Sequence, residues 1–420
     1  MPLFPYQETG VEYLLSGNRR LLFDDPGLGK TAQTITALTR TPESDPTLIV
    51  CPAYVKRTWE AEAVKWGLGR KTNVLFGKGQ FRWPLPGEVN IVNPDVFPTS
   101  TDDIVWNAPK NMRLVFDEVH MYKSKTAYRT RAAIAMRKAT VSKGGSVWGL
   151  TGSPIMSYPD DLWVMLTVLG LEQDAYGRRT NFDYLFNKTM KMDRGFWKTS
   201  WGEPRPEASA RLSSVGLGRS RVKVLPDLPT KTYAVQTVNV KHRSSPIDMT
   251  DEEMEEQWGT VLQRTIGNAR AALAIDKARS VLEWVEAESE THSIVVFTYH
   301  TEAAKVFEKL GPVITGATAT DVRNKLIAGF QNGEYKVITG TIGAMGVGVT
   351  LHKSYHAVFI DRDYQPSANT QAEDRICRIG QVHPVLITDV LSDNKLDMQV
   401  AKILAKKTNI INASVEAARV

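Results

Sequence analysis

The sequence predicts an α/β protein built from two units, each with a parallel β-sheet. Short apolar runs rich in strand-forming residues alternate with helical patterns. These runs fall into two series, separated by a stretch rich in charge, Gly and Pro at about 170–241. Buried apolar strands separated by helices are typical of parallel sheets. A length of 420 residues leaves room for two or three domains.

The expected elements follow these two series. The first series of strands contains residues 21–23, 48–51, 90–92, 114–116 and 147–150, and the second contains residues 294–297, 336–339, 357–360 and 385–390. A helical segment is expected at 250–288, and Pro226 and Pro229 mark the expected boundary between the halves. The expected domains are lobe 1 at 1–232 with a basic helical insertion at about 155–225, a linker or helical segment at 233–275, and lobe 2 at 276–420.

Composition narrows the class of protein. Hydrophobic residues make up 42% and charged residues 23% of the chain, which is ordinary for a globular protein. No apolar run approaches the ~20 residues that span a bilayer, and the N-terminus lacks the pattern of a secretory signal. Cys51 and Cys377 are too few for a disulfide framework or a cysteine-rich zinc site. We therefore expect a cytoplasmic protein without a membrane partner, and a chain this compact would suit a prokaryote or a virus-infected cell.

The positive charge is concentrated in one stretch. The chain carries a net charge of +6, whereas residues 178–231 hold twelve Lys and Arg against five acids, a net of +7. Aromatic residues are interleaved with these cations: Phe182, Tyr184, Phe186, Phe196, Trp197 and Trp201. Such a pattern suits a polyanion such as nucleic acid. The alternative is a solvated surface around a small helical core.

The segment DDPGLGKT at residues 24–31 has the features of a phosphate-binding loop. It follows an apolar run and precedes a helix-like segment. In such a loop the backbone around Gly27 and Gly29 converges on phosphate oxygens, and the helix N-terminus favours negative charge. Lys30 would reach the β- and γ-phosphates, and the Thr31 hydroxyl would ligate Mg²⁺. The usual first glycine falls on Asp24.

Two carboxylates follow another expected strand. Asp117 and Glu118 come directly after the apolar residues 114–116. At the carboxyl edge of a parallel sheet, Asp117 would hold Mg²⁺ and Glu118 would orient the attacking water as a general base. Alone, such a pair indicates a solvated turn. The Gly-Lys-Thr segment upstream favours the catalytic interpretation.

These motifs resemble the Swi/Snf-type DNA translocases of helicase superfamily two, nearest in spelling to the annealing-helicase-like branch. The matching segments occur in the family's order over nearly the whole chain: PYQ (5–7), DDPGLGKT (24–31), LIVCP (48–52), DEVH (117–120), LTGSPI (150–155), GAMGVGVTL (343–351) and QAEDRICRIGQ (371–381). The resemblance implies two RecA-like P-loop NTPase lobes. The family's own loop is DEMGLGKT, so the missing first glycine is a family trait, whereas Asp25 and Pro26 depart from it.

The resemblance also implies roles for single residues. Gln7 would read adenine, and Gly346 and Gly348 would lie in a motif that contacts nucleotide and DNA. Nucleotide state would be coupled to neighbouring motifs by His120, Thr151, Ser153 and Gln371. DNA phosphates would be contacted by Lys56 and Arg57, and the basic stretch adds Arg219, Arg221 and Lys223 as expected contacts to DNA.

Two arginines are expected to complete the catalytic site. Arg375 and Arg378 stand three residues apart, which on a helix places them on one face. Two guanidiniums can stabilise charge on a transferring phosphoryl group. We expect them to meet the γ-phosphate held by lobe 1, as the resemblance implies.

The resulting hypothesis is an ATP-dependent DNA translocase with DNA-stimulated ATPase activity. It would use ATP and Mg²⁺, act as a monomer, and move along double-stranded DNA to remodel protein–DNA or branched DNA structures. One alternative is a strand-separating DNA or RNA helicase. A second is a nucleotide-gated DNA-binding subunit with little hydrolysis.

Overall fold

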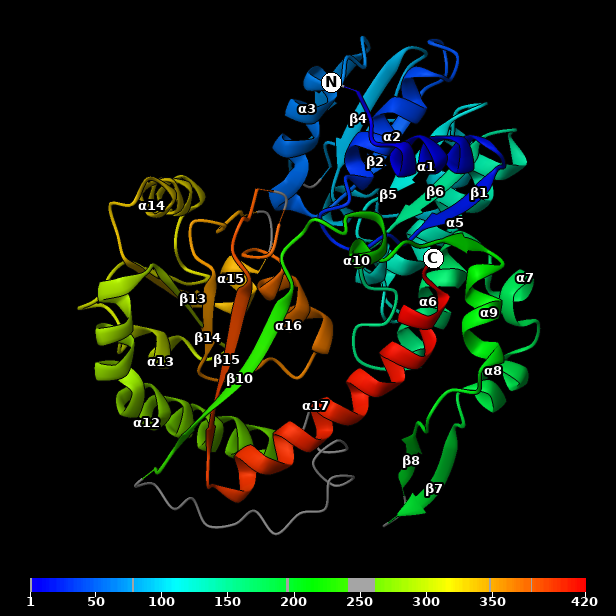
Figure 1. The fold of residues 1–420 in the computed structure, drawn as a ribbon. Coiled ribbons are helices and arrows are strands. Elements are labelled where there is room, and N and C mark those ends of the chain that lie inside the picture. Colours follow the sequence, from blue (N-terminus) through cyan, green and yellow to red (C-terminus); the bar gives the residue numbers. More distant parts are fainter. Residues whose placement is uncertain (1, 78, 194–195, 241–260, 347–348, 379) are drawn as a thin grey trace. The chain divides into compact units, whose positions relative to one another are not determined.

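The computed structural model describes residues 2–77, 79–193, 196–240, 261–346, 349–378 and 380–420. The chain forms two compact units (Figure 1). Unit 1 comprises Met1–Thr189, Trp201–Pro226 and Ile410–Val420, and unit 2 comprises Met190–Ser200 and Asp227–Asn409. Among the helices of the described ranges, none is both long and apolar enough to cross a membrane.

Unit 1 is built on a sheet whose strands all pair in parallel, in the order β3-β4-β2-β5-β6-β1-β9. Its strands are β1 (Arg19–Leu22), β2 (Thr47–Val50), β3 (Lys71–Val74), β4 (Glu88–Val92), β5 (Arg113–Phe116), β6 (Ser146–Leu150) and β9 (Gly216–Leu217). The central strands are buried on both faces, which explains their continuous apolar runs.

Helices cover both faces of this sheet. The helices of unit 1 are α1 (Pro5–Leu15), α2 (Lys30–Thr39), α3 (Lys56–Lys65), α4 (Thr101–Asn107), α5 (Tyr128–Ser142), α6 (Pro159–Leu169), α7 (Glu172–Tyr176), α8 (Arg179–Leu185), α9 (Glu207–Ser213) and α10 (Arg221–Val224), with short 3₁₀ turns η1 (Ala53–Val55), η2 (Pro94–Val96), η3 (Val119–Met121) and η4 (Glu416–Ala418). One core packs α1, α2 and α3 against the sheet, and the other packs α4, α5 and α6 against its opposite face.

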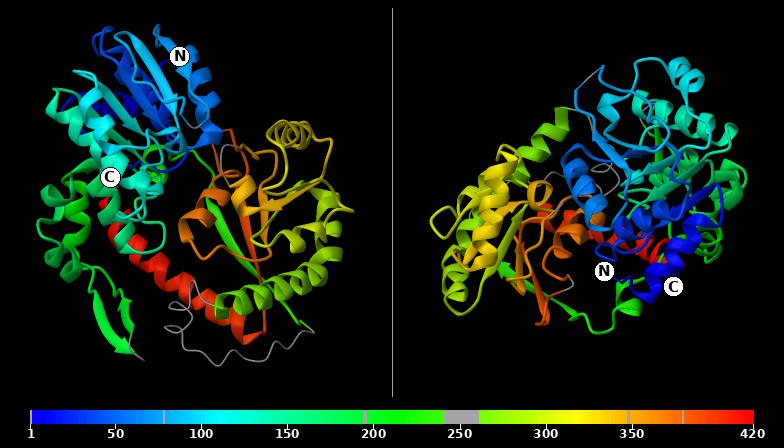
Figure 2. Two further views of the ribbon diagram at one scale, coloured as in Figure 1. Left: turned by 180° about the vertical axis from the view of Figure 1, so that it is seen from behind. Right: turned by 90° about the horizontal axis from the view of Figure 1, so that it is seen from above.

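Unit 2 repeats this architecture with a parallel sheet in the order β10-β15-β14-β11-β13-β12. Its strands are β10 (Lys231–Val238), β11 (Ile294–Thr298), β12 (Val313–Ile314), β13 (Val337–Thr341), β14 (His356–Phe359) and β15 (Val385–Ser392). Its helices are α12 (Val261–Thr291), α13 (Thr301–Lys305), α14 (Thr320–Asn332), α15 (Ile342–Met345), α16 (Pro366–Glu373) and α17 (Lys395–Ser414), the last of which continues into unit 1 from Ile410 onward. In the views of Figure 2, α12 runs along one face of this sheet, where it packs on β11 and β14. A two-stranded sheet joins β7 (Thr189–Asp193) and β8 (Phe196–Ser200).

The prediction of two parallel α/β lobes is confirmed, and all nine expected strands are present. The compact units nevertheless differ from the expected boundaries. Strand β10 lies in the segment expected to be a linker, and residues from Ile410 onward belong to unit 1. Because β10 is a half-exposed edge strand, it lacks a continuous apolar run. The expected helix at 250–288 is present from Val261 onward, and its earlier part lies outside the described residues.

Candidate active site

The phosphate loop joins β1 to α2 and depends on two glycines. Gly27 has φ 88° and Gly29 has φ 76°, the left-handed region that costs glycine least. A Cβ on Gly29 would also lie 2.4 Å from Nε2 of Gln7. Helix α2 begins at Lys30, directly after Gly29. The backbone therefore presents a helix N-terminus at a glycine turn, which suits a phosphate.

The Lys30 side chain lies over its own loop. Its Nζ donates to the carbonyl oxygens of Asp24 at 2.7 Å and Asp25 at 3.2 Å. Burial lowers the pKa of Lys30, and the nearby carboxylates of Glu118 and Asp24 oppose this shift. The amine thus lies over the loop, where the charges of Glu118 and Asp24 act on it.

The acidic pair follows β5, as predicted. Asp117 Oδ2 accepts a hydrogen bond from the buried Trp59 indole at 2.7 Å. Burial, then the charge of Glu118, raises the pKa of Asp117 to about 7. Glu118 adopts φ 49° and ψ 49°, an uncommon left-handed conformation, and its N–H donates to Asp117 Oδ1 at 3.0 Å. A buried carboxylate with a raised pKa gains from a divalent cation, so these residues fit Mg²⁺.

A short chain of contacts links the acidic pair to the loop after β6. His120 Nδ1 lies 3.2 Å from Glu118 Oε2 and 2.8 Å from Thr151 Oγ1. Burial lowers the pKa of His120 to about 4, so the ring is neutral at pH 7. The Thr151 hydroxyl in turn accepts from the Ser153 N–H at 2.9 Å. The structure therefore brings together three of the residues predicted to couple motifs, next to Glu118.

Gln7 lies beside the same loop. Its Nε2 donates to the Leu28 carbonyl at 3.2 Å, and its Oε1 accepts from the Phe4 N–H at 3.0 Å. The side chain is buried. This position is compatible with a contact to a nucleotide base, although its own hydrogen bonds are made within the protein.

Asp24 and Arg219 form a buried pair that the sequence did not reveal. The guanidinium donates from Nε to Asp24 Oδ1 at 2.8 Å and from Nη2 to Oδ2 at 2.5 Å. Gln33 joins them, with its Nε2 3.1 Å from Asp24 Oδ2 and its Oε1 2.7 Å from Arg219 Nη2. Because Arg219 is only 3% exposed, the structure contradicts its predicted contact with DNA phosphates. Arg219 therefore binds Asp24, the residue that stands where other phosphate loops have their first glycine.

Asp25 and Pro26, the two departures from the family's spelling, also have structural partners. Asp25 Oδ2 accepts from the Arg221 N–H at 2.7 Å, and Oδ1 pairs with Arg419 Nη1 at 2.5 Å. Pro26 packs so closely on Gly152 that a Cβ there would lie 2.8 Å from Pro26 Cγ. Both residues therefore join the phosphate loop to neighbouring segments of unit 1.

In unit 2, Arg375 and Arg378 both reach the loop after α15. Arg375 Nε donates to the Gly346 carbonyl at 2.8 Å, and Arg378 Nη1 donates to Val349 O at 3.1 Å and Thr350 Oγ1 at 3.0 Å. The expectation that both stand on a helix is wrong, because α16 ends at Glu373. The Arg375 N–H bonds three residues back to Ala372, so turns replace the helix there.

The remaining predicted residues of unit 2 are placed only in part. Gly346 caps α15, and a Cβ on it would lie 2.4 Å from the Ile342 carbonyl, so the close turn requires glycine. Gln371 is buried in α16. Gly348 lies outside the described residues.

Comparison with known families agrees with this geometry. The model of the SNF2-related domain matches residues 6–247, and that of the helicase conserved C-terminal domain matches residues 276–380. The chain belongs to the SNF2-related family. Two of the curated proteins that match the chain are named as helicases: the DNA annealing helicase and endonuclease ZRANB3 and an uncharacterized ATP-dependent helicase of Mycoplasma genitalium.

Several curated proteins are similar over nearly the whole chain. The DNA annealing helicase and endonuclease ZRANB3 of Bos taurus is 25% identical over 98% of this chain and 40% of its own length. The Caenorhabditis elegans homologue of SWI/SNF-related matrix-associated actin-dependent regulator of chromatin subfamily A-like protein 1 is 27% identical, over 97% and 61%. The SWI2/SNF2 ATPase core of Sulfolobus solfataricus in complex with dsDNA is 22% identical over 99% of this chain and 94% of that chain, with a TM-score of 0.45. The chain thus spans between 40% and 61% of the two curated relatives.

The predicted DNA contacts of this SNF2-related chain divide into buried and exposed residues. The structure contradicts the prediction for Lys56, which is 2% exposed and donates to Leu75 O at 2.8 Å and Asn93 Oδ1 at 2.9 Å. Arg57 is exposed beside it and pairs with Glu60 at 2.7 Å. Lys223 is exposed and Arg221 is half-buried. For these three cations, DNA contact stays a prediction.

Many residues of the basic stretch contribute to the core or to ion pairs within the protein. Phe182, Phe186 and Trp201 are buried and belong to the core of unit 1. Arg179 pairs with Asp160 and Asp183. The alternative of a small helical core therefore describes much of this stretch, and its net charge overstates the cationic surface.

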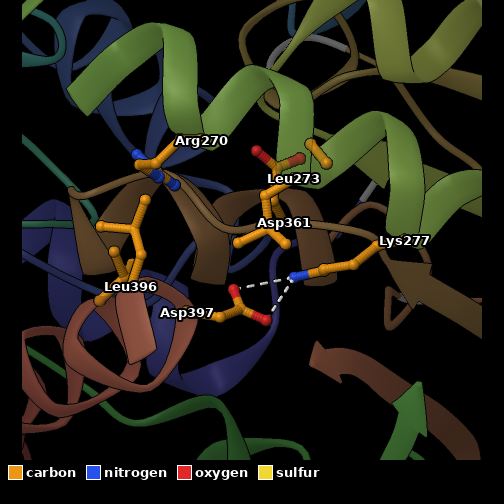
Figure 3. A pocket seen from close by; sticks show the side chains of 8 residues that line it. Arg270, Leu273, Lys277, Asp361, Leu396 and Asp397 are labelled. Atoms are coloured by element: carbon orange, nitrogen blue, oxygen red, sulfur yellow. Dashed lines mark hydrogen bonds and ion pairs between the residues drawn. The ribbon is translucent and has the colours of Figure 1, made fainter. Parts of the chain in front are cut away.

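A small polar cavity lies in unit 2, and none of the residues described above lines it (Figure 3). Arg270, Lys277, Asp361 and Asp397 line it, and Lys277 Nζ lies 3.0 Å from both Asp397 oxygens. Its volume of about 10 Å³ gives room for about one water, too little for a nucleotide.

Sequence reasoning missed the supporting role of three residues at the SNF2-related site, one of which, Arg219, it assigned to DNA instead. Trp59 contacts Asp117, Arg219 contacts Asp24 and Arg419 contacts Asp25, across 58 to 394 positions in sequence. Asp24, which replaces the first glycine, could have indicated a cationic partner, because a buried carboxylate needs one. Nothing in the sequence indicates which cation it is.

Proposed function

We propose that this chain is an ATP-dependent DNA translocase whose ATPase activity is stimulated by DNA. The observation that carries the proposal is the assembly, within unit 1, of a glycine phosphate loop, Lys30 and the Asp117–Glu118 pair. A chain of contacts then leads from Glu118 through His120 to Thr151. This arrangement supports phosphoryl transfer that is sensed by a neighbouring loop.

ATP would be held by residues of the phosphate loop. The backbone at Gly27 and Gly29 and the Lys30 amine would bind its phosphates, and Gln7 would contact the base. Thr31 and Asp117 would hold Mg²⁺, which neutralises charge on the phosphates when bound.

Hydrolysis needs a base and positive charge. Glu118 would orient the attacking water and accept its proton. Arg375 and Arg378 would stabilise charge on the transferring phosphoryl group. Arg378→Ala should lose hydrolysis more than ATP binding, and wild-type turnover in this variant would refute the assignment.

The proposed polymer is double-stranded or branched DNA, bound by one copy of the chain. Family membership supports nucleic acid, and the similarity to ZRANB3, a DNA annealing helicase and endonuclease, supports DNA. Contacts to backbone phosphates would give weak sequence preference and strong salt dependence.

Two displacement assays separate translocation from strand separation. A translocase should remove the third strand from a DNA triplex in an ATP-dependent reaction while leaving an ordinary partial duplex paired. Strand displacement without triplex displacement would favour a strand-separating helicase. A protein that binds DNA under ATP control without turnover would be the gated subunit instead, which the presence of Glu118 and both arginines argues against.

A further inference from the structure

The segment after α17 places a buried arginine behind the phosphate loop. Arg419 is 4% exposed, and its Nε donates to the Phe23 carbonyl at 3.2 Å. Its Nη1 pairs with Asp25 Oδ1 at 2.5 Å, and its Nη2 donates to the Gly152 carbonyl at 2.6 Å. One guanidinium therefore contacts both the phosphate loop and the loop after β6.

Backbone pairing fixes this segment to unit 1. The Val420 N–H donates to Gly218 O at 3.0 Å, and the Ser220 N–H donates to Val420 O at 3.0 Å. Lys223 Nζ donates to the Arg419 carbonyl at 3.0 Å. Arg419 is thus anchored on its backbone independently of what its side chain contacts.

Two arginine–aspartate pairs consequently hold adjacent positions of the loop. Arg219 holds Asp24 from one side, and Arg419 holds Asp25 together with the Phe23 carbonyl. The next residue, Pro26, packs on Gly152, whose carbonyl Arg419 also contacts. The loop is therefore held by side chains at the point where a first glycine would otherwise form the turn.

We propose that Arg419 is a positioning residue for the ATPase reaction. It holds residues 23–25 against Gly152, so that the carbonyls around Lys30 and the Thr151–His120–Glu118 chain keep a fixed spacing. The inference rests on the proposed function, in that ATP is taken to bind this loop. Arg419 itself makes no contact with the reacting atoms.

The test compares Arg419→Gln and Arg419→Lys with a matched control, Glu416→Gln. Glu416 pairs with the same guanidinium but lies in η4, away from the loop. We expect both Arg419 variants to lower kcat/KM for ATP by about 10- to 100-fold, because small misplacements of reacting groups have effects of this size. Lysine keeps the charge but cannot donate to three acceptors in a fixed plane, so it should not rescue turnover. Glu416→Gln should stay within about twofold of the wild type, a difference of less than 0.5 kcal/mol.

The Tm of each variant is measured by thermal unfolding, so that a loss of activity can be distinguished from a loss of folded protein. All assays are run well below the Tm of the weakest variant, and binding of a fluorescent ATP analogue is measured beside turnover. A lowered Tm with unchanged kcat and KM for both Arg419 variants would overturn the proposal, since Arg419 would then only anchor the segment.

A double-mutant cycle with Asp25→Asn tests the contact itself. If Arg419 acts through Asp25, the double variant should lose no more kcat/KM than Arg419→Gln alone, whereas fully additive losses would contradict this route. If the proposed function itself is wrong, the result differs from a failure of the Arg419 proposal. The wild-type protein would then not bind ATP, or would bind it equally well after Lys30→Ala.

Discussion

At the scale of single residues, the site is defined by buried charges held by specific partners. Asp24 and Asp25 look like defects in a phosphate loop when only the sequence is seen. In the structure each carboxylate is held by its own arginine, and Pro26 packs on a neighbouring glycine. These partners lie 195 and 394 positions away along the chain, so only the fold could identify them.

Glu118→Gln tests the general base. The amide keeps the size of the side chain but cannot accept a proton from water, so turnover should fall by about 10²- to 10⁴-fold while ATP still binds. Steady-state turnover and equilibrium ATP binding measure the two effects. Lys30→Ala is the comparison, because it should weaken binding as well. Normal turnover in Glu118→Gln would remove Glu118 from the mechanism.

Trp59→Phe tests the support of Asp117. The substitution keeps a buried aromatic ring but removes the 2.7 Å hydrogen bond to Oδ2. Because groups that orient metal ligands commonly contribute 10- to 100-fold to metal affinity, the Mg²⁺ concentration that gives half-maximal turnover should rise by about tenfold. Trp148→Phe is a matched control, since Trp148 is equally buried in β6. An equal change in both variants would show a general loss of packing.

At the scale of elements, a strand or helix could be predicted from the sequence when neighbouring residues alone decide its structure. The strands at 48–51 and 294–297 could be predicted because they are buried on both faces and read as continuous apolar runs. Strand β10 alternates and lies at an edge, and the turns that carry Arg375 follow a sequence that is compatible with a helix. Whether such a segment forms a strand, a helix or turns depends on contacts with distant residues. One example is Lys231, which pairs with Glu373 and Asp374.

Asp361 shows how one carboxylate fixes a loop in unit 2. It accepts from Thr298 Oγ1 at 2.6 Å and the Tyr299 N–H at 2.8 Å, and it lies 2.6 Å from His300 Nδ1. Burial raises its pKa, but the bond to His300 and nearby cations outweigh burial and hold the pKa at about 2. A pKa below the ordinary 3.8 means that the folded state favours the ionised form.

The expected consequence is a loss of stability in acid. The contribution of Asp361 is present above pH 4 and is lost as the pH falls toward 2, and Asp361→Asn should remove about 2 kcal/mol at pH 7. Denaturant unfolding at pH 7 and at low pH measures it. The exposed Asp321 of α14 provides a control substitution that should change little. Equal effects of both variants would contradict the role of the buried network.

At the scale of the whole molecule, DNA binding should depend on exposed cations and not on the total positive charge. Arg57→Gln should weaken duplex binding at all sequences and reduce the salt slope by about one. Arg279→Gln is a matched control, because both arginines have side chains that are 69% exposed and each has an acid three residues away. Electrophoretic or fluorescence titrations at several salt concentrations provide the measurement. An unchanged slope for Arg57→Gln would remove it from the DNA-binding surface.

In the proposed function, DNA drives ATP turnover by this chain. The most direct measurement is the ATPase rate of the wild-type protein alone, and with single-stranded DNA, duplex DNA, forked DNA or RNA. We expect duplex or forked DNA to raise the rate by at least about tenfold, which corresponds to about 1.4 kcal/mol, and Glu118→Gln to abolish it. A rate that is the same with and without DNA, or that only RNA raises, would contradict the proposal of a DNA-stimulated ATPase.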